Sequence, residues 1–147
     1  MVGRKLGLLN ELGEDHKLVL GLFAWMEKNK ADFNNTFLYI MGEKISSFDG
    51  FVNKEFSDWI LSWRKRLLKN KVSKNECFEI MRLSNPLVIP RNHLVEKAKS
   101  SVNNKNEMSS FNNFLKVLQS PYRHTRLTRN FQDPPEDEGS YQTFCGT

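Results

Sequence analysis

The stretch NPLVIPRNHLVEKA, residues 85–98, decides how this chain folds because it combines two prolines, three consecutive apolar residues and the start of a helical pattern. Pro86 and Pro90 each push the preceding residue toward extended backbone and remove a backbone donor, so a helix arriving from the N-terminal side must end there. Pro90 also suits the first position of a new helix, where its missing N–H costs nothing. The stretch therefore predicts a helix, a short extended elbow and a second helix.

The elbow is predicted to have a structural role. Leu87 and Ile89 are expected to enter the groove between the flanking helices. Arg91 and His93 are expected to bond to carbonyls that the prolines leave unpaired, for about 1 kcal/mol per neutral hydrogen bond. The elbow residues with this predicted role are Asn85, Pro86, Pro90, Arg91, Asn92 and His93.

Outward from the elbow, apolar residues recur at helical spacing, and no stretch of any length shows the alternation of a β-strand. Asp32 is a predicted helix N-cap, and Ser73 with Glu76 has the spacing of a capping box. The sequence thus predicts an all-α fold, a compact bundle of about five or six helices. The helices are expected at about residues 14–29, 32–42, 53–69, 73–84, 90–102 and 108–120.

The chain divides in character after the last predicted helix. Residues 1–121 are interpreted as one helical domain, whereas residues 122–147 run from basic RHTRLTR through acidic PPEDE to an aromatic end. An unattached tail would gain nothing from aromatic residues. We therefore expect an extended tail that packs back onto the helices at its end.

Composition excludes several classes of protein. The 147 residues are 39% hydrophobic, enough to bury a core, and the net charge of +5 is too small to indicate a nucleic-acid-binding protein. Positive charge is concentrated centrally: residues 1–59 carry 7 basic and 9 acidic groups, whereas residues 60–105 carry 11 and 3. No window reaches the roughly 18 apolar residues of a membrane span.

The basic run WRKRLLKNK, residues 63–71, allows two interpretations. It is either a surface for RNA, an acidic lipid face or an acidic protein, or a solvated helix face whose Trp and Leu belong to the core. The run has no glycine-rich RNA motif and no exposed stacking aromatics, which favours the solvated face. The candidate partner-binding residues are Arg64, Lys65, Arg66, Lys69 and Lys71.

The two cysteines form neither a disulfide framework nor a metal-ligand pattern, which indicates a reducing compartment and a cytoplasmic protein. Cys77 falls on an inward helical face and is expected in the core. Cys145, three residues from the end, is a candidate redox-responsive thiol, with packing beside Phe144 as the alternative.

The histidines do not assemble a catalytic site. They fall in three separate predicted elements, and no nucleophile stands at a suitable spacing from any of them. We therefore expect no catalytic, cofactor-binding or metal-binding residue in this chain alone.

Four motifs carry a resemblance that runs in order over nearly the whole chain. They are RKLGL at residues 4–8, the elbow, SPY at 120–122 and PPEDEGSYQTFCGT at 134–147. Together they resemble the closing region of the selenoprotein O family, also called SelO, YdiU or UPF0061. The resemblance implies a nucleotidyltransferase family with a pseudokinase fold that transfers AMP from ATP to protein hydroxyls (AMPylation). The family's closing Cys motif matches Cys145, and some relatives carry selenocysteine near that point.

The resemblance also implies what this chain lacks. The family's Gly-rich loop, its Lys and Glu pair and its metal-binding Asn and Asp lie in an upstream kinase-like core, to which no segment here corresponds. A complete member would use ATP and Mg²⁺, and no catalytic residue carries over. Two hypotheses follow from this resemblance. In the first, the chain is a non-catalytic buttress or regulatory piece whose partner is the upstream core, and the complete enzyme acts on protein substrates. Alternatively, it is a stand-alone helical module that binds a protein or acidic surface through its basic central face.

Overall fold

The computed structural model describes residues 2–10, 12–45, 48–102 and 108–135. These residues contain helices and no strand, so the predicted all-α fold is confirmed, with a short N-terminal helix added to the predicted ones. The α-helices are α1 (Val2–Lys5), α2 (Asp15–Asn29), α3 (Phe33–Ile40), α4 (Lys54–Leu67), α5 (Lys74–Ser84), α6 (Asn92–Val102) and α7 (Met108–Leu118). Two 3₁₀ turns accompany them, η1 (Asp49–Val52) and η2 (Thr128–Phe131).

Side-chain caps start three of these helices. Asp32 accepts a hydrogen bond from the backbone N–H of Asn35 at 2.8 Å, and Ser73 accepts one from Glu76 at 3.2 Å, as their sequence positions predicted. Asn53 does the same for α4, accepting from Phe56 at 2.8 Å. Each cap satisfies one of the backbone donors that a helix start leaves without an intrahelical partner.

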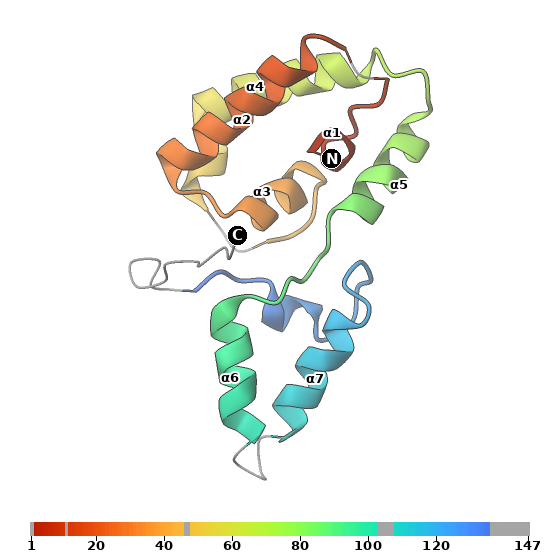
Figure 1. The fold of residues 1–147 in the computed structure, drawn as a ribbon. Coiled ribbons are helices and arrows are strands. Elements are labelled where there is room, and N and C mark those ends of the chain that lie inside the picture. Colours follow the sequence, from red (N-terminus) through yellow and green to blue (C-terminus); the bar gives the residue numbers. More distant parts are fainter. Residues whose placement is uncertain (1, 11, 46–47, 103–107, 136–147) are drawn as a thin grey trace.

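The helices form two tiers. In the upper tier of Figure 1, α2 and α4 lie side by side, α5 descends along the opposite edge, and α1 and α3 fill the space between them. The residues just after α1 belong to the core: Leu6 is 0% exposed, and its carbonyl accepts a hydrogen bond from the Trp63 indole N–H at 2.8 Å. Aromatic side chains pack together in the core of the upper tier, where the ring centroids of Trp25 and Phe56 are 4.3 Å apart.

The lower tier is a hairpin of α6 and α7, closed by η2 (Figure 1). Phe131 of η2 packs against Phe114 of α7, with ring centroids 5.1 Å apart. Residues 122–147 were expected to be extended. As far as residue 135, the structure instead turns them into η2 and buries Thr128 and Gln132. The end of the tail lies outside the described residues.

The elbow joins the two tiers, and its burial differs from the prediction. Leu87 and Val88 are 2% and 1% exposed, whereas Ile89, expected in the groove, is partly exposed. Neighbouring residues of an extended strap point to opposite sides. Both sides are covered here, because the elbow passes between the two tiers (Figure 1). The Leu87 N–H donates to the carbonyl of Pro121 at 2.7 Å.

The helix after the elbow also begins later than predicted. α6 starts at Asn92 rather than Pro90. The Arg91 N–H donates to the carbonyl of Ile89 at 2.8 Å, which makes a tight turn around Pro90. The Arg91 carbonyl then accepts from Val95, so Arg91 occupies the N-cap position.

Candidate functional site

Asn85 sits at the junction of three elements. It is 1% exposed, and its side-chain amide donates to the carbonyls of Lys5 at 2.8 Å and Met81 at 3.0 Å. Its side-chain oxygen accepts from the Lys5 ammonium at 3.2 Å. Asn85 therefore ties the end of α1 to the end of α5. Pro86 contributes its carbonyl, which accepts from Asn34 at 3.1 Å.

Arg91 has a different main partner from the one the sequence suggested. Its guanidinium donates two hydrogen bonds to the Asp32 carboxylate, at 2.6 and 2.7 Å. It also donates to the side-chain oxygen of Asn35 at 3.3 Å and, among the described residues, to one backbone carbonyl, that of Gln132, at 3.2 Å. The side chain is 9% exposed, and its Nε has no hydrogen-bond partner within the part of the chain that the structure describes. This fork joins the start of α3, the start of α6 and the segment after η2.

The neighbouring residues of the elbow contribute less. Asn92 is exposed, and the partly buried His93 side chain makes no hydrogen bond to a carbonyl of the described residues. Burial is the main cause that lowers the pKa of His93, and the positive charges of Arg91 and Lys97 lower it further. A neutral His93 is the form that this environment favours.

The predicted basic face is divided by the structure. Arg66, expected on a solvated face, is 3% exposed and holds Asp15 with bonds of 2.5 and 2.9 Å. It also donates to the carbonyls of Leu9 and Asn10 at 3.1 and 3.2 Å. Arg66 is therefore a core residue that anchors the N-terminal loop, because its position on α4 faces α2 rather than water.

The other four basic residues are exposed but differ in their partners. Lys69 pairs with Glu14 at 2.5 Å across two half-exposed side chains. The side chains of Arg64, Lys65 and Lys71 have no ion pair or hydrogen bond to any part of the chain that the structure describes. Arg64 and Lys65 lie at an open groove.

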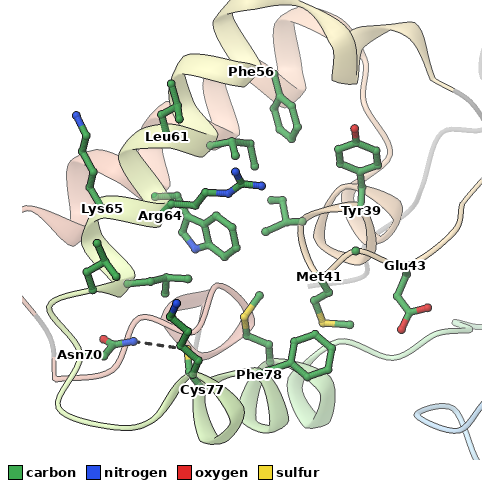
Figure 2. A pocket seen from close by; sticks show the side chains of 18 of the residues that line it. Tyr39, Met41, Glu43, Phe56, Leu61, Arg64, Lys65, Asn70, Cys77 and Phe78 are labelled. Carbon is green, nitrogen blue, oxygen red and sulfur yellow. Dashed lines mark hydrogen bonds between the residues drawn. The ribbon is translucent and has the colours of Figure 1, made fainter.

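This groove is larger than the hollow between α6, α7 and η2, which has a volume of about 310 Å³. The groove runs between α4, α5 and the end of α3 and has a volume of about 1130 Å³. Figure 2 shows Phe56, Met41 and Phe78 around it, with Arg64 extended across it and Lys65 at its edge. Four large apolar side chains on it are exposed to solvent: Tyr39 by 38%, Leu61 by 54%, Leu68 by 73% and Phe78 by 43%.

Cys77 belongs to the floor of this groove and is 6% exposed, as the sequence predicted. Its thiol donates to the carbonyl of Gly7 at 3.2 Å, and Asn70 approaches its sulfur at 3.5 Å (Figure 2). Burial raises the pKa of the Cys77 thiol, an effect that Asn70 partly offsets. This environment favours the unreactive thiol form. Cys145, the redox candidate, lies outside the described residues.

Sequence reasoning missed both buried ion pairs. Asp32 was predicted only as a helix N-cap, and nothing in the sequence linked Asp15 and Asp32 to Arg66 and Arg91, 51 and 59 residues away. The one signal in the sequence was that Arg66 lies within an amphipathic helix and next to apolar residues.

Within residues 2–10, 12–45, 48–102 and 108–135, no three His, Cys, Asp or Glu side chains gather as metal ligands would. No helix in the same ranges is long and apolar enough to cross a membrane. The groove, which the exposed cations Arg64, Lys65 and Lys74 line, is the candidate site, and its chemistry is that of an apolar surface with a positive edge.

Comparison with known proteins gives consistent matches. Residues 1–119 match the family described as protein adenylyltransferase SelO. The chain is 37% identical over 148 residues to the protein nucleotidyltransferase YdiU of Pelagibacter ubique and 38% identical to that of Nitrosococcus oceani, covering 100% of this chain and 30% of each relative. It is 39% identical over 144 residues to the same protein of Alkaliphilus metalliredigens, 97% of this chain and 29% of the relative. The chain thus spans about a third of the length of these relatives.

Proposed function

The chain belongs to the SelO family, and we propose that it is the C-terminal helical portion of a protein nucleotidyltransferase that transfers AMP from ATP to protein hydroxyls. One observation carries this proposal: nearly the whole chain matches the relatives, yet it accounts for only 30% of their length. In this proposal the remaining part of the protein is a kinase-like core that binds ATP and Mg²⁺. The protein acts in the cytoplasm, a compartment that keeps cysteines reduced.

The proposed role of this portion is to buttress that core and not to take part in the chemistry. Its rigid features support such a role, because the Arg66–Asp15 and Arg91–Asp32 pairs fix how its helices meet. A preorganised support holds catalytic groups in place without touching the substrate. The stand-alone binding module is the alternative, and its basic face is reduced to Arg64, Lys65 and Lys71 by the burial of Arg66 and the pairing of Lys69.

The first test uses the chain alone. We expect no incorporation of labelled AMP when it is incubated with ATP and Mg²⁺, whereas the complete Nitrosococcus oceani relative, treated identically, serves as the positive control. AMP incorporated by this chain alone would show that it carries its own catalytic site and would refute the buttress role.

The second test uses a chimera. This chain replaces the 148 matched residues of the Nitrosococcus oceani relative, and AMP transfer to a protein acceptor is measured. We expect the chimera to be active and the relative without its matched segment to be inactive. Full activity without that segment would refute the buttress role.

A further inference from the structure

We propose that the groove between α3, α4 and α5 is the surface on which the catalytic part of the protein docks, through an apolar segment that carries acidic side chains. The catalytic part is the kinase-like core of the proposed function, on which this inference rests. The inference adds the surface and the chemistry of the contact. The matched segment is only 30% of each relative, so more than two-thirds of such a protein lies outside this chain, and a buttress must offer it a contact surface.

The first argument is exposed apolar surface. Leu61 on α4 and Phe78 on α5 border the groove from two sides (Figure 2). Leu68, seven residues after Leu61, lies on the same side of α4. The exposed fractions of Leu61, Leu68 and Phe78 are 54%, 73% and 43%, and contiguous apolar surface of this kind marks an interaction site. The volume of about 1130 Å³ exceeds the roughly 300–1,000 Å³ of small-molecule pockets, so a polypeptide segment suits the groove better.

The second argument is charge. The side chains of Arg64, Lys65 and Lys74 line the groove and have no ion pair or hydrogen bond to the residues that the structure describes. The acidic residue that lines it, Glu43, already faces His124 at 3.2 Å. Cations beside exposed apolar side chains complement an apolar segment with acidic residues, and such complementarity fixes the register of binding.

The third argument is the position of α1. The carbonyl of Leu6 accepts a hydrogen bond from the Trp63 indole at 2.8 Å. The carbonyl of Gly7 accepts from Asn70 at 2.8 Å and from the Cys77 thiol at 3.2 Å. These three donors all line the groove, so the residues just after α1 are bonded to its walls.

This position places the attachment of the catalytic part near the groove. In the proposed function the catalytic part precedes α1, a helix of four residues and about 6 Å. A segment of that part is therefore joined to this chain close to the groove. Covalent attachment gives such a segment a high effective concentration, so that even weak contacts keep it docked.

The test compares how fast a cysteine in the groove reacts with a water-soluble maleimide in this chain alone and in the chimera described above. Leu61→Cys places the cysteine in the groove, and Leu20→Cys places the matched control on α2, where it does not line the groove. Both leucines lie within helices and are 54% and 51% exposed. Peptide mass spectrometry follows labelling at each position separately from that of other cysteines.

We expect labelling at position 61 to be about tenfold slower or more in the chimera than in the chain alone, because the reagent reaches the thiol only while the segment is undocked. Labelling at position 20 should be equal in the two proteins. Cys77, 6% exposed, should be labelled slowly in both and thereby reports that the helices are folded. Leu68→Cys provides a second groove position if the Leu61→Cys chain does not fold.

A charge variant tests the second argument. Protection is the labelling rate in the chain alone divided by the rate in the chimera, a ratio that cancels the direct effect of a nearby charge on the thiol. Lys65→Glu with Lys74→Glu should lower the protection at position 61 several-fold. The control is Lys17→Glu with Lys116→Glu, which changes the net charge equally on exposed residues that do not line the groove and should leave the protection unchanged.

An apolar variant tests the first argument. Leu68→Ser with Phe78→Ser should also lower the protection at position 61 several-fold, because docking then buries less apolar surface. The control is Leu83→Ser with Leu115→Ser, which removes two leucines that are 57% and 44% exposed but do not line the groove. This control should leave the protection unchanged.

Three outcomes would overturn the proposal. They are equal labelling at position 61 in the chain alone and in the chimera, protection that the groove variants and their controls lower equally, and labelling of the chain alone that slows as its concentration rises. The last result would assign the groove to a second copy of the chain. AMP transfer is measured separately: an active chimera with an unprotected position 61 refutes only the docking site, whereas an inactive chimera with a protected position 61 refutes only the proposed function.

Discussion

At the scale of single residues, the side of a helix on which a charged residue lies decides whether it is solvated or buried in an ion pair. Lys65 and Arg66 are neighbours on α4, yet Lys65 is exposed and Arg66 is 3% exposed with five hydrogen bonds to the N-terminal loop, Asp15 and Asn70. Consecutive helical residues point about 100° apart. One faces water and the other faces the core.

We therefore expect Arg66→Ala to lower the free energy of unfolding by about 3–5 kcal/mol, because it leaves the Asp15 carboxylate buried without its partner. Lys65→Ala should change it by less than about 0.5 kcal/mol. Midpoints of denaturant unfolding measure both. Equal midpoints would mean that Arg66 is solvated as the sequence suggested.

Asp15 also predicts a dependence of stability on pH. The hydrogen bond from Arg66 is the main cause that lowers the pKa of Asp15, and burial opposes it. The unfolded chain therefore takes up this proton at higher pH than the folded one. The stability that Asp15 contributes is fully present above the ordinary Asp pKa of about 3.9 and is lost as pH falls through the lowered value.

Unfolding free energies measured from about pH 5 downward test this dependence. Asp15→Asn should flatten the acid slope, whereas Asp58→Asn, on an exposed carboxylate 4.0 Å from Lys54, should leave it unchanged. An acid slope unchanged by Asp15→Asn would contradict the assignment.

At the scale of elements, the elbow is stabilised by adjacent buried residues. Leu87 is 2% exposed between the tiers, and Ile89 is partly exposed. We expect Leu87→Ala to cost about 2–5 kcal/mol through the cavity it creates, and Ile89→Ala clearly less. Chemical denaturation of the two variants decides the order. If Ile89→Ala lowers the free energy of unfolding more than Leu87→Ala does, the elbow packs mainly through Ile89.

The contact of α1 with α5 depends on a glycine. Gly7 has φ +67°, and an added Cβ would lie 2.5 Å from the Cys77 sulfur and 2.9 Å from that of Met81. Gly7→Ala should therefore cost more than the roughly 1–2 kcal/mol of the backbone strain alone. Gly42 has φ +86° and open space around it, so Gly42→Ala measures the backbone strain without a steric clash. Gly13→Ala should leave the stability nearly unchanged. Thermal unfolding should rank the three in that order, and a Gly7 variant no worse than the Gly42 variant would refute the close contact.

At the scale of the whole molecule, the Arg91–Asp32 fork connects the tiers. It joins α3 of the upper tier to α6 and to the segment after η2. Arg91→Lys keeps the charge but loses the two-bond geometry. We expect it to cost about 1–3 kcal/mol and to speed hydrogen exchange in α6 and α7 more than in α2 and α4.

Arg82→Lys is the control for this experiment, because Arg82 also donates two hydrogen bonds to one carboxylate, both to the same Glu79 oxygen, on the surface of a single helix. It should change exchange little in either tier. Uniformly faster exchange across both tiers in Arg91→Lys would show that they unfold as one unit.

Local signals in the sequence predicted most of the elements. Periodic apolar residues gave the helices, and Asp32 and Ser73 cap two of them where expected. The start of α6 was predicted two residues early, because the turn at Pro90 depends on a bond between Arg91 and Ile89 that no propensity rule describes. The candidate groove was not predicted, since its walls come from three helices separated along the chain.

By itself, the sequence determined the all-α class, the break at Pro86 and the membership of the SelO family, because helix periodicity, proline stereochemistry and motif order are properties of short or ordered stretches. Only the tertiary structure decided that Arg66 is core, that Arg91 binds Asp32 and that Leu61, Leu68 and Phe78 share one open groove. These features depend on which residues, more than fifty positions apart in the case of both ion pairs, are brought together by packing. Local sequence patterns do not encode that proximity.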